Sequence, residues 1–122
     1  MPSEQRKPTR VLVVEDDQAT RDALVHLLAG LGYRAIPAAN VADGLALLDG
    51  QAFAILDLNL PDGLGTQILQ RIRAEKRPIR VALATASSDP DLLTEALNHG
   101  PDLILRKPFN VNVLLEWLEA SD

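Results

Sequence analysis

Residues 11–17 read VLVVEDD, an apolar run that ends in three acidic residues. A short apolar run without polar alternation is typical of a strand buried on both faces, as in a parallel sheet. Similar runs recur further along the chain, at residues 52–56, 81–84 and 103–105, with a weaker one at 33–36. The sequence therefore predicts five strands.

Segments with the apolar spacing of a helix separate these strands. We predict five helices, around residues 23–31, 41–48, 68–72, 90–99 and 111–118. Asn40, Asp89 and Asn110 precede three of them as candidate N-caps, and Gly32 and Gly100 follow two as candidate terminators. The order strand then helix, repeated five times, predicts an α/β fold: a doubly wound five-stranded parallel sheet with helices on both faces.

The chain has 122 residues, 47% of them hydrophobic, which suits one domain with a real core. We predict a disordered tail over residues 1–9 and one domain over residues 10–122. The net charge of −5 and the aromatic content of 3% argue against a nucleic-acid-binding surface. The sequence has no apolar run long enough to cross a membrane, no apolar stretch typical of a secretory signal and no cysteine, so we expect a cytoplasmic protein without membrane contact.

Polar side chains directly follow four of the five strands. They are Glu15, Asp16 and Asp17, then Asp57, then Thr85, and finally Arg106 and Lys107. Because ligands bind at the carboxyl ends of parallel strands, these side chains should meet at one edge of the sheet. Each residue alone would be read as a helix cap, a turn hydroxyl or a surface charge, but those roles do not explain the agreement of four strand ends. We assign Asp17 to capping the first helix.

Carboxylates crowded at one edge repel each other unless a cation lies among them or some of them are protonated. The available ligands are oxygen atoms, so Mg²⁺ is the expected cation and cofactor. A divalent metal, a free carboxylate, a hydroxyl and an ammonium together suit phosphoryl transfer, in which the carboxylate attacks phosphorus and the other groups stabilise the transferred charge.

Four motifs in this arrangement resemble the receiver domain of two-component response regulators. They are VLVVEDD at 11–17, DLNLPDGLG at 57–65, ATA at 84–86 and KPF at 107–109. The resemblance covers about residues 10–120, nearly the whole chain, and four motifs in order are far more specific than one. The resemblance implies a flavodoxin-like (βα)5 fold with strand order 2-1-3-4-5. It also implies a phospho-accepting role in bacterial two-component signalling, with a sensor histidine kinase or a phosphotransfer protein as partner.

The resemblance further implies the role of each acidic residue. Asp57 would be the phospho-acceptor and a metal ligand. Asp16 would bind Mg²⁺ directly, Glu15 would act through a metal-bound water, and the backbone carbonyl of Asn59 would be the third protein ligand. Such a domain promotes its own phosphorylation and dephosphorylation without being a conventional enzyme.

Thr85 would hydrogen-bond the phosphoryl group, and Lys107 would form an ion pair with it. The Lys107–Pro108 peptide is usually cis in similar proteins, which would direct the ammonium inward. Three residues before Lys107 the family usually has Tyr or Phe, a ring that moves when the threonine moves. This sequence has Ile104 there, so the predicted switch residues are Thr85 and Ile104.

The fifth helix supplies candidate interface residues. Its predicted core stripe consists of Val111, Leu114, Leu115 and Leu118. Val113 and Trp117 fall outside the stripe, and we expect them on the flank facing the fourth helix and fifth strand, where similar receivers form dimers or bind output partners. One interpretation makes Trp117 an interface anchor of a homodimer or partner contact; the alternative makes it a lid over the fourth helix.

Three other functions fit parts of the pattern. A haloacid-dehalogenase-like phosphatase needs a second aspartate where this chain has Asn59. A flavodoxin-type FMN module needs a phosphate-binding loop after the first strand, where Glu15, Asp16 and Asp17 would repel phosphate. A degenerate receiver would serve only as a docking or dimerisation module, and labelling at Asp57 separates it from a phospho-accepting one.

Overall fold

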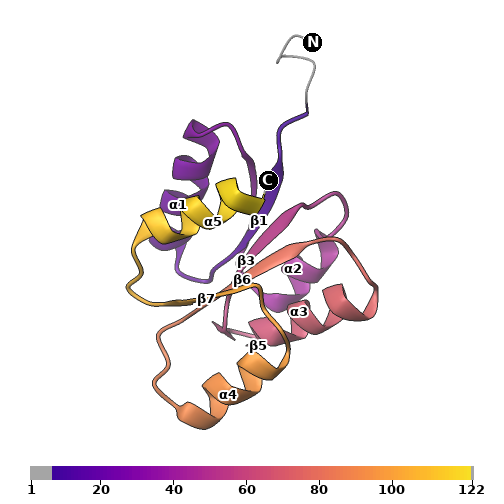
Figure 1. Cartoon of the computed structure of the whole chain (residues 1–122), viewed down its shortest axis with the longest axis vertical. Helices are drawn as coiled ribbons and strands as arrows, with labels where there is room; N and C mark the ends of the chain where they lie inside the picture. The colour runs from indigo at the N-terminus through magenta and orange to yellow at the C-terminus, as the bar shows by residue number, and fades with distance from the viewer. Residues whose placement is uncertain (1–6, 122) are drawn as a thin grey trace.

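Residues 7–121 are described by a computed structural model (Figure 1). One parallel sheet contains β1 (Arg10–Val14), β2 (Arg34–Ala38), β3 (Phe53–Asp57), β6 (Arg80–Thr85) and β7 (Leu103–Arg106). Its order is β2-β1-β3-β6-β7. This order is the predicted 2-1-3-4-5, because β6 and β7 are the fourth and fifth strands of the sheet.

Helices cover both faces of the sheet, as predicted. They are α1 (Gln18–Gly30), α2 (Val41–Ala46), α3 (Gly65–Ala74), α4 (Pro90–Asn98) and α5 (Val111–Ser121). Alternate residues of β1 enter opposite core clusters: Leu12 packs with buried residues of α2, α3 and α4, whereas Val13 packs with those of α1 and α5. The sheet interior is therefore buried on both sides, which explains the unbroken apolar runs.

Three predicted caps are present. The side chain of Asp17 accepts from the Thr20 N–H at the start of α1, Asn40 caps α2, and Asp89 caps α4 ahead of Pro90. Helix α2 is shorter than the apolar spacing indicated, because it ends at Ala46 while Leu48 enters the core beyond the helix.

A small antiparallel hairpin follows the third strand and was not predicted. It pairs β4 (Asn59–Leu60) with β5 (Gly63–Leu64) immediately before α3. Strands of two residues are too short to produce an alternating pattern, so the sequence showed only a turn here.

The start of the chain departs partly from the predicted tail. Residues 1–6 of that tail lie outside the described residues. Thr9 does not belong to a free tail, because its carbonyl accepts a hydrogen bond from the Arg34 N–H at 2.8 Å. Between residues 7 and 121, no helix is long and apolar enough to cross a membrane.

The fifth helix matches its predicted stripe at three of four positions. Leu114 and Leu118 are fully buried and Leu115 packs beside them, whereas Val111 lies at the helix start and lines a surface groove. Val113 is 45% exposed, as expected.

Trp117 is half-buried, and its role as an interface anchor stays a prediction, whereas its surroundings differ from the predicted lid over α4. Its ring meets Phe53 of β3 edge to face at 5.3 Å and joins the core cluster of α1 and α5. The tryptophan side chain is long enough to contact the sheet even from the flank of a helix. Helical spacing gives only the direction of each residue around the helix, so it did not predict this contact.

Candidate functional site

Two acidic residues stand buried at the carboxyl ends of the central strands. Asp57 ends β3 and is 8% exposed, and Glu15 directly follows β1 and is 4% exposed. Gly65 makes room for the backbone here, since a Cβ at that position would lie 2.2 Å from the Asp57 carbonyl oxygen. The tight packing holds Asp57 in place.

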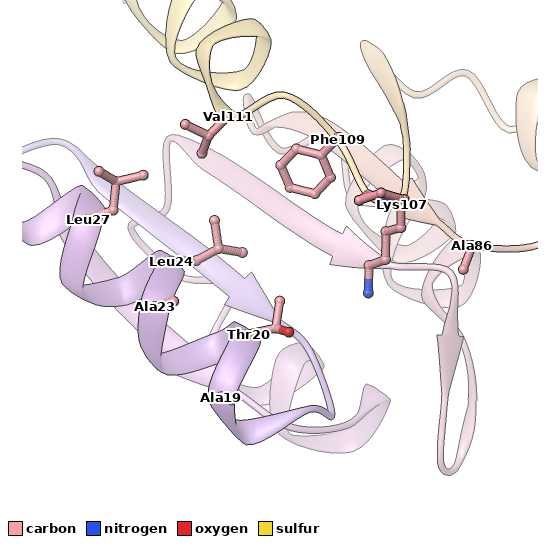
Figure 2. Close-up of a pocket in the computed structure, with 10 residues that line it drawn as sticks. Ala19, Thr20, Ala23, Leu24, Leu27, Ala86, Lys107, Phe109 and Val111 are labelled. Carbon is pink, nitrogen blue, oxygen red and sulfur yellow. The ribbon is translucent and has the colours of Figure 1, made fainter.

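Lys107 joins these two carboxylates. Its Nζ lies 2.6 Å from Glu15 Oε1 and 3.2 Å from Asp57 Oδ2. The Lys107 N–H donates to the Thr85 carbonyl at 2.8 Å, and the following peptide to Pro108 is cis, as the resemblance implied. In Figure 2 the side chain extends from the loop after β7 toward the ends of the central strands.

The charge of Lys107 is secured by its partners. Partial burial by itself lowers the pKa of the ammonium, but the hydrogen bond to Glu15 and the charge of Asp57 outweigh it, so the pKa lies above its ordinary value. The ammonium therefore stays protonated at neutral pH.

Asp16 completes the acidic cluster from the solvent side. It is exposed, and one carboxylate oxygen each from Glu15, Asp16 and Asp57 lie within 4.8 Å of one another. Arg21 of α1 braces the loop that carries two of them, because its guanidinium donates to the Glu15 carbonyl at 2.9 Å. Three oxygen donors around one opening match the preference of Mg²⁺, so the residues present fit the implied metal.

The remaining predicted site residues lie on β6, β4 and β7. Thr85 ends β6, next to β3 in the sheet, and is fully buried with its Oγ1 accepting from the Ser87 N–H at 2.9 Å. Asn59 is exposed at the start of β4, two residues beyond Asp57. Ile104 is half-buried in the edge strand β7. The metal-binding role of Asn59 and the switch role of Thr85 and Ile104 stay predictions.

A groove opens beside Lys107. It has a volume of about 700 Å³ and is lined mostly by apolar side chains of α1 and of the loop after β7, among them Leu24, Leu27 and Phe109 (Figure 2). Sequence reasoning did not find it, because two segments far apart in the chain form its walls.

The family model of the response regulator receiver domain matches residues 11–119 of this sequence. The chain belongs to this family. Its acidic pocket consists of Glu15, Asp16 and Asp57 with the Lys107 ammonium against it, and the roles of these residues in phosphorylation stay predictions.

Curated relatives are longer than this receiver domain. The chain is 37% identical over 115 residues to the KDP operon transcriptional regulatory protein KdpE of Escherichia coli, covering 93% of this chain and 51% of that protein. It is 31% identical over 104 residues to a cyclic di-GMP phosphodiesterase of Thermotoga maritima, covering 85% of this chain and 28% of that protein. The chain therefore spans about half or less of the length of these relatives.

Solved structures share the fold over nearly the full chain. A CheY-like receiver domain protein from Methanospirillum hungatei has a TM-score of 0.85 at 29% identity, with 93% of each chain covered. The BeF3-activated DrrB receiver domain has a TM-score of 0.84 at 27% identity, covering 94% of this chain and 97% of that one.

Proposed function

We propose that this receiver domain accepts a phosphoryl group on Asp57 from a phosphohistidine donor, with Mg²⁺, and thereby switches a protein-interaction surface. The observation that carries the proposal is the Lys107 ammonium held between two buried carboxylates, 3.2 Å from Asp57. A structural ion pair would need only one carboxylate, and burial of a second one is costly unless it has a use.

The metal would be held by Asp16 and Asp57 directly, by Glu15 through water and by the carbonyl of Asn59. It supplies positive charge that lets an anionic phosphoryl group approach the acidic pocket. The degenerate alternative, a docking module without phosphorylation, has less support, because the sequence retains every residue that phosphorylation would need. These are Asp57, Lys107, Thr85, Glu15 and Asp16.

In the proposed transfer, an Asp57 carboxylate oxygen attacks phosphorus with its electron pair. The new P–O bond makes an acyl phosphate, the P–N bond to the donor histidine breaks, and the imidazole nitrogen keeps that electron pair. Lys107 then pairs with the transferred group, and the Thr85 hydroxyl donates to it. Water later attacks the phosphorus, the P–O bond to Asp57 breaks with its electron pair left on the carboxylate, and inorganic phosphate is released.

The donor would be a sensor histidine kinase or a phosphotransfer protein, and the groove beside Lys107 is the proposed surface for it. Lys107, which lies 3.2 Å from Asp57, lines this groove together with α1 and the loop after β7, so a protein bound there would lie beside the acceptor. The proposed dimer or output surface is the face of α4, β7 and α5, where Leu97 and Val113 are 58% and 45% exposed.

Incubation with acetyl phosphate and Mg²⁺, followed by intact-mass measurement, tests the proposal. We expect the wild type to gain one phosphoryl group and Asp57→Asn to gain none. Asp22→Asn, which neutralises an exposed aspartate of α1, is the matched control and should be labelled like the wild type. No labelling of the wild type would favour the docking module, and labelling of Asp57→Asn would overturn the assignment of Asp57 as the acceptor.

A further inference from the structure

The turn of the β4–β5 hairpin carries a carboxylate that binds the start of α2. Asp62 Oδ1 accepts a hydrogen bond from the Val41 N–H at 2.7 Å, and Asp62 Oδ2 accepts one from the Ala42 N–H at 3.0 Å. These residues open α2, where backbone amides have no partner within the helix. The bond from Val41, followed by that from Ala42, lowers the pKa of the Asp62 carboxyl.

Helix α2 needs this contact more than a long helix would. It has six residues, fewer than an isolated helix needs to be stable in water. Its own N-cap, Asn40, accepts from the Asp43 N–H at 2.7 Å and thus serves only the third amide of the helix. Asp62 therefore supplies, from 20 residues away in the sequence, the caps that Asn40 does not.

The base of the same hairpin is joined to the acidic pocket. β4 begins at Asn59, two residues after Asp57. Leu58 between them is fully buried, and its carbonyl accepts from the Gly65 N–H at 2.8 Å. Gln67 of α3 holds β5 through a further hydrogen bond of 2.8 Å to its backbone. The hairpin is thus tied to the pocket at its base and to α2 at its turn.

We propose that Asp62 is a positioning residue that couples α2 to the metal-binding carbonyl of Asn59. The proposal rests on the proposed function for the assignment of Asn59 as a ligand. A metal bound to the Asn59 carbonyl would restrict the position of the hairpin. That position determines both hydrogen bonds that the first two amides of α2 donate to Asp62. Because such coupling is reciprocal, an ordered α2 strengthens metal binding by the factor by which bound metal strengthens the cap of α2.

The test compares Asp62→Ala with Asp43→Ala by two measurements, the Mg²⁺ affinity from calorimetry and the hydrogen exchange of the Val41 and Ala42 amides. Asp43 is a matched control, because it lies in the first turn of α2 with the same charge and its carboxylate accepts a hydrogen bond from Asn40, at the start of the same helix. We expect Asp62→Ala to weaken Mg²⁺ binding about tenfold, the low end for a residue that orients a metal ligand. Mg²⁺ should slow exchange of both amides in the wild type and in Asp43→Ala, and leave it unchanged in Asp62→Ala.

Asp62→Asn keeps one acceptor and should fall between the two, which preserves the test if Asp62→Ala does not fold. Wild-type Mg²⁺ affinity in both Asp62 variants, or an equal effect of Asp43→Ala, would overturn the coupling. Failure of the proposed function has a different signature. It would appear as absent labelling of the wild type by acetyl phosphate, whereas the coupling is read from metal binding and exchange alone.

Discussion

Replacement of Lys107 by methionine should destabilise the domain by about 2 kcal/mol in metal-free buffer. Removing one partner from a buried ion pair costs about 3–5 kcal/mol, because a charge is left buried without compensation. Here both Glu15 and Asp57 lose their cation, but the Lys107 side chain is 24% exposed, so solvent screens part of the interaction and reduces the cost to about 2 kcal/mol. Methionine keeps most of the side-chain length and removes only the charge.

Urea unfolding in the presence of EDTA measures this loss. Trp117 is a suitable fluorescent reporter, because its ring packs on Phe53 in the folded domain. With a slope of about 2 kcal/mol per molar urea, the midpoint should fall by about 1 M. Mg²⁺ should then stabilise Lys107→Met more than the wild type, since the carboxylates left without a cation are those expected to bind the metal. Lys7→Met, at an exposed position before β1, is the control and should behave like the wild type.

The dependence on pH gives a second check. Because its pKa is raised in the folded state, Lys107 contributes its full stabilisation below the ordinary lysine pKa of 10.5, and this is lost as the pH rises through the higher folded value. The gap between wild type and variant should therefore persist to pH 10.5 and close above it. A variant within about 0.5 kcal/mol of the wild type at neutral pH would refute the reasoning. Adding Glu15→Gln should recover part of the loss, and further destabilisation would show that packing, not charge, was lost.

Three further outcomes are expected. Gly65→Ala should lower the stability by about 2 kcal/mol or more in thermal unfolding, because its Cβ would lie 2.2 Å from the backbone oxygen of Asp57, which cannot rotate away. Asp16→Ala should weaken Mg²⁺ binding more than Glu15→Ala does, since a direct ligand contributes more than one acting through water; calorimetry showing the reverse order would contradict the assignment. Because the pKa of Asp62 lies below the ordinary aspartate value of 3.8, acidification should protonate Asp62 and remove the cap of α2 only below pH 3.8. The NMR chemical shifts of the first two α2 amides should therefore change with a midpoint below that pH.

Apolar runs and caps were sufficient to predict a parallel sheet covered by helices on both faces, whereas its strand order was implied by the family resemblance. The runs at 11–14 and 52–56 lack polar alternation because helices cover both faces of the sheet, so successive residues of these strands must be apolar. Asp17 and Asn40 mark helix starts because their bonds reach only three residues along the chain. Such features depend only on residues a few positions apart, so they can be predicted from the sequence.

The acidic pocket was predictable for a related reason. In a parallel sheet the carboxyl ends of all strands share one edge, so Glu15, Asp57 and Lys107 had to converge once the strands were known. The order of the strands does not predict which carboxylate forms an ion pair with the Lys107 ammonium. The structure shows that Lys107 contacts both, and that Glu15 is the nearer partner.

The sequence by itself therefore determined the strands, the sheet edge and the residue types that meet there, because these depend on burial and on neighbours in the chain. Only the tertiary structure decided the contacts between segments without a shared pattern: Asp62 on α2, Trp117 on Phe53 and the groove along α1. Each of these joins segments that lie at least 20 residues apart in the chain, so it depends on how the elements pack against one another. Such packing has no period in the sequence from which it could be predicted.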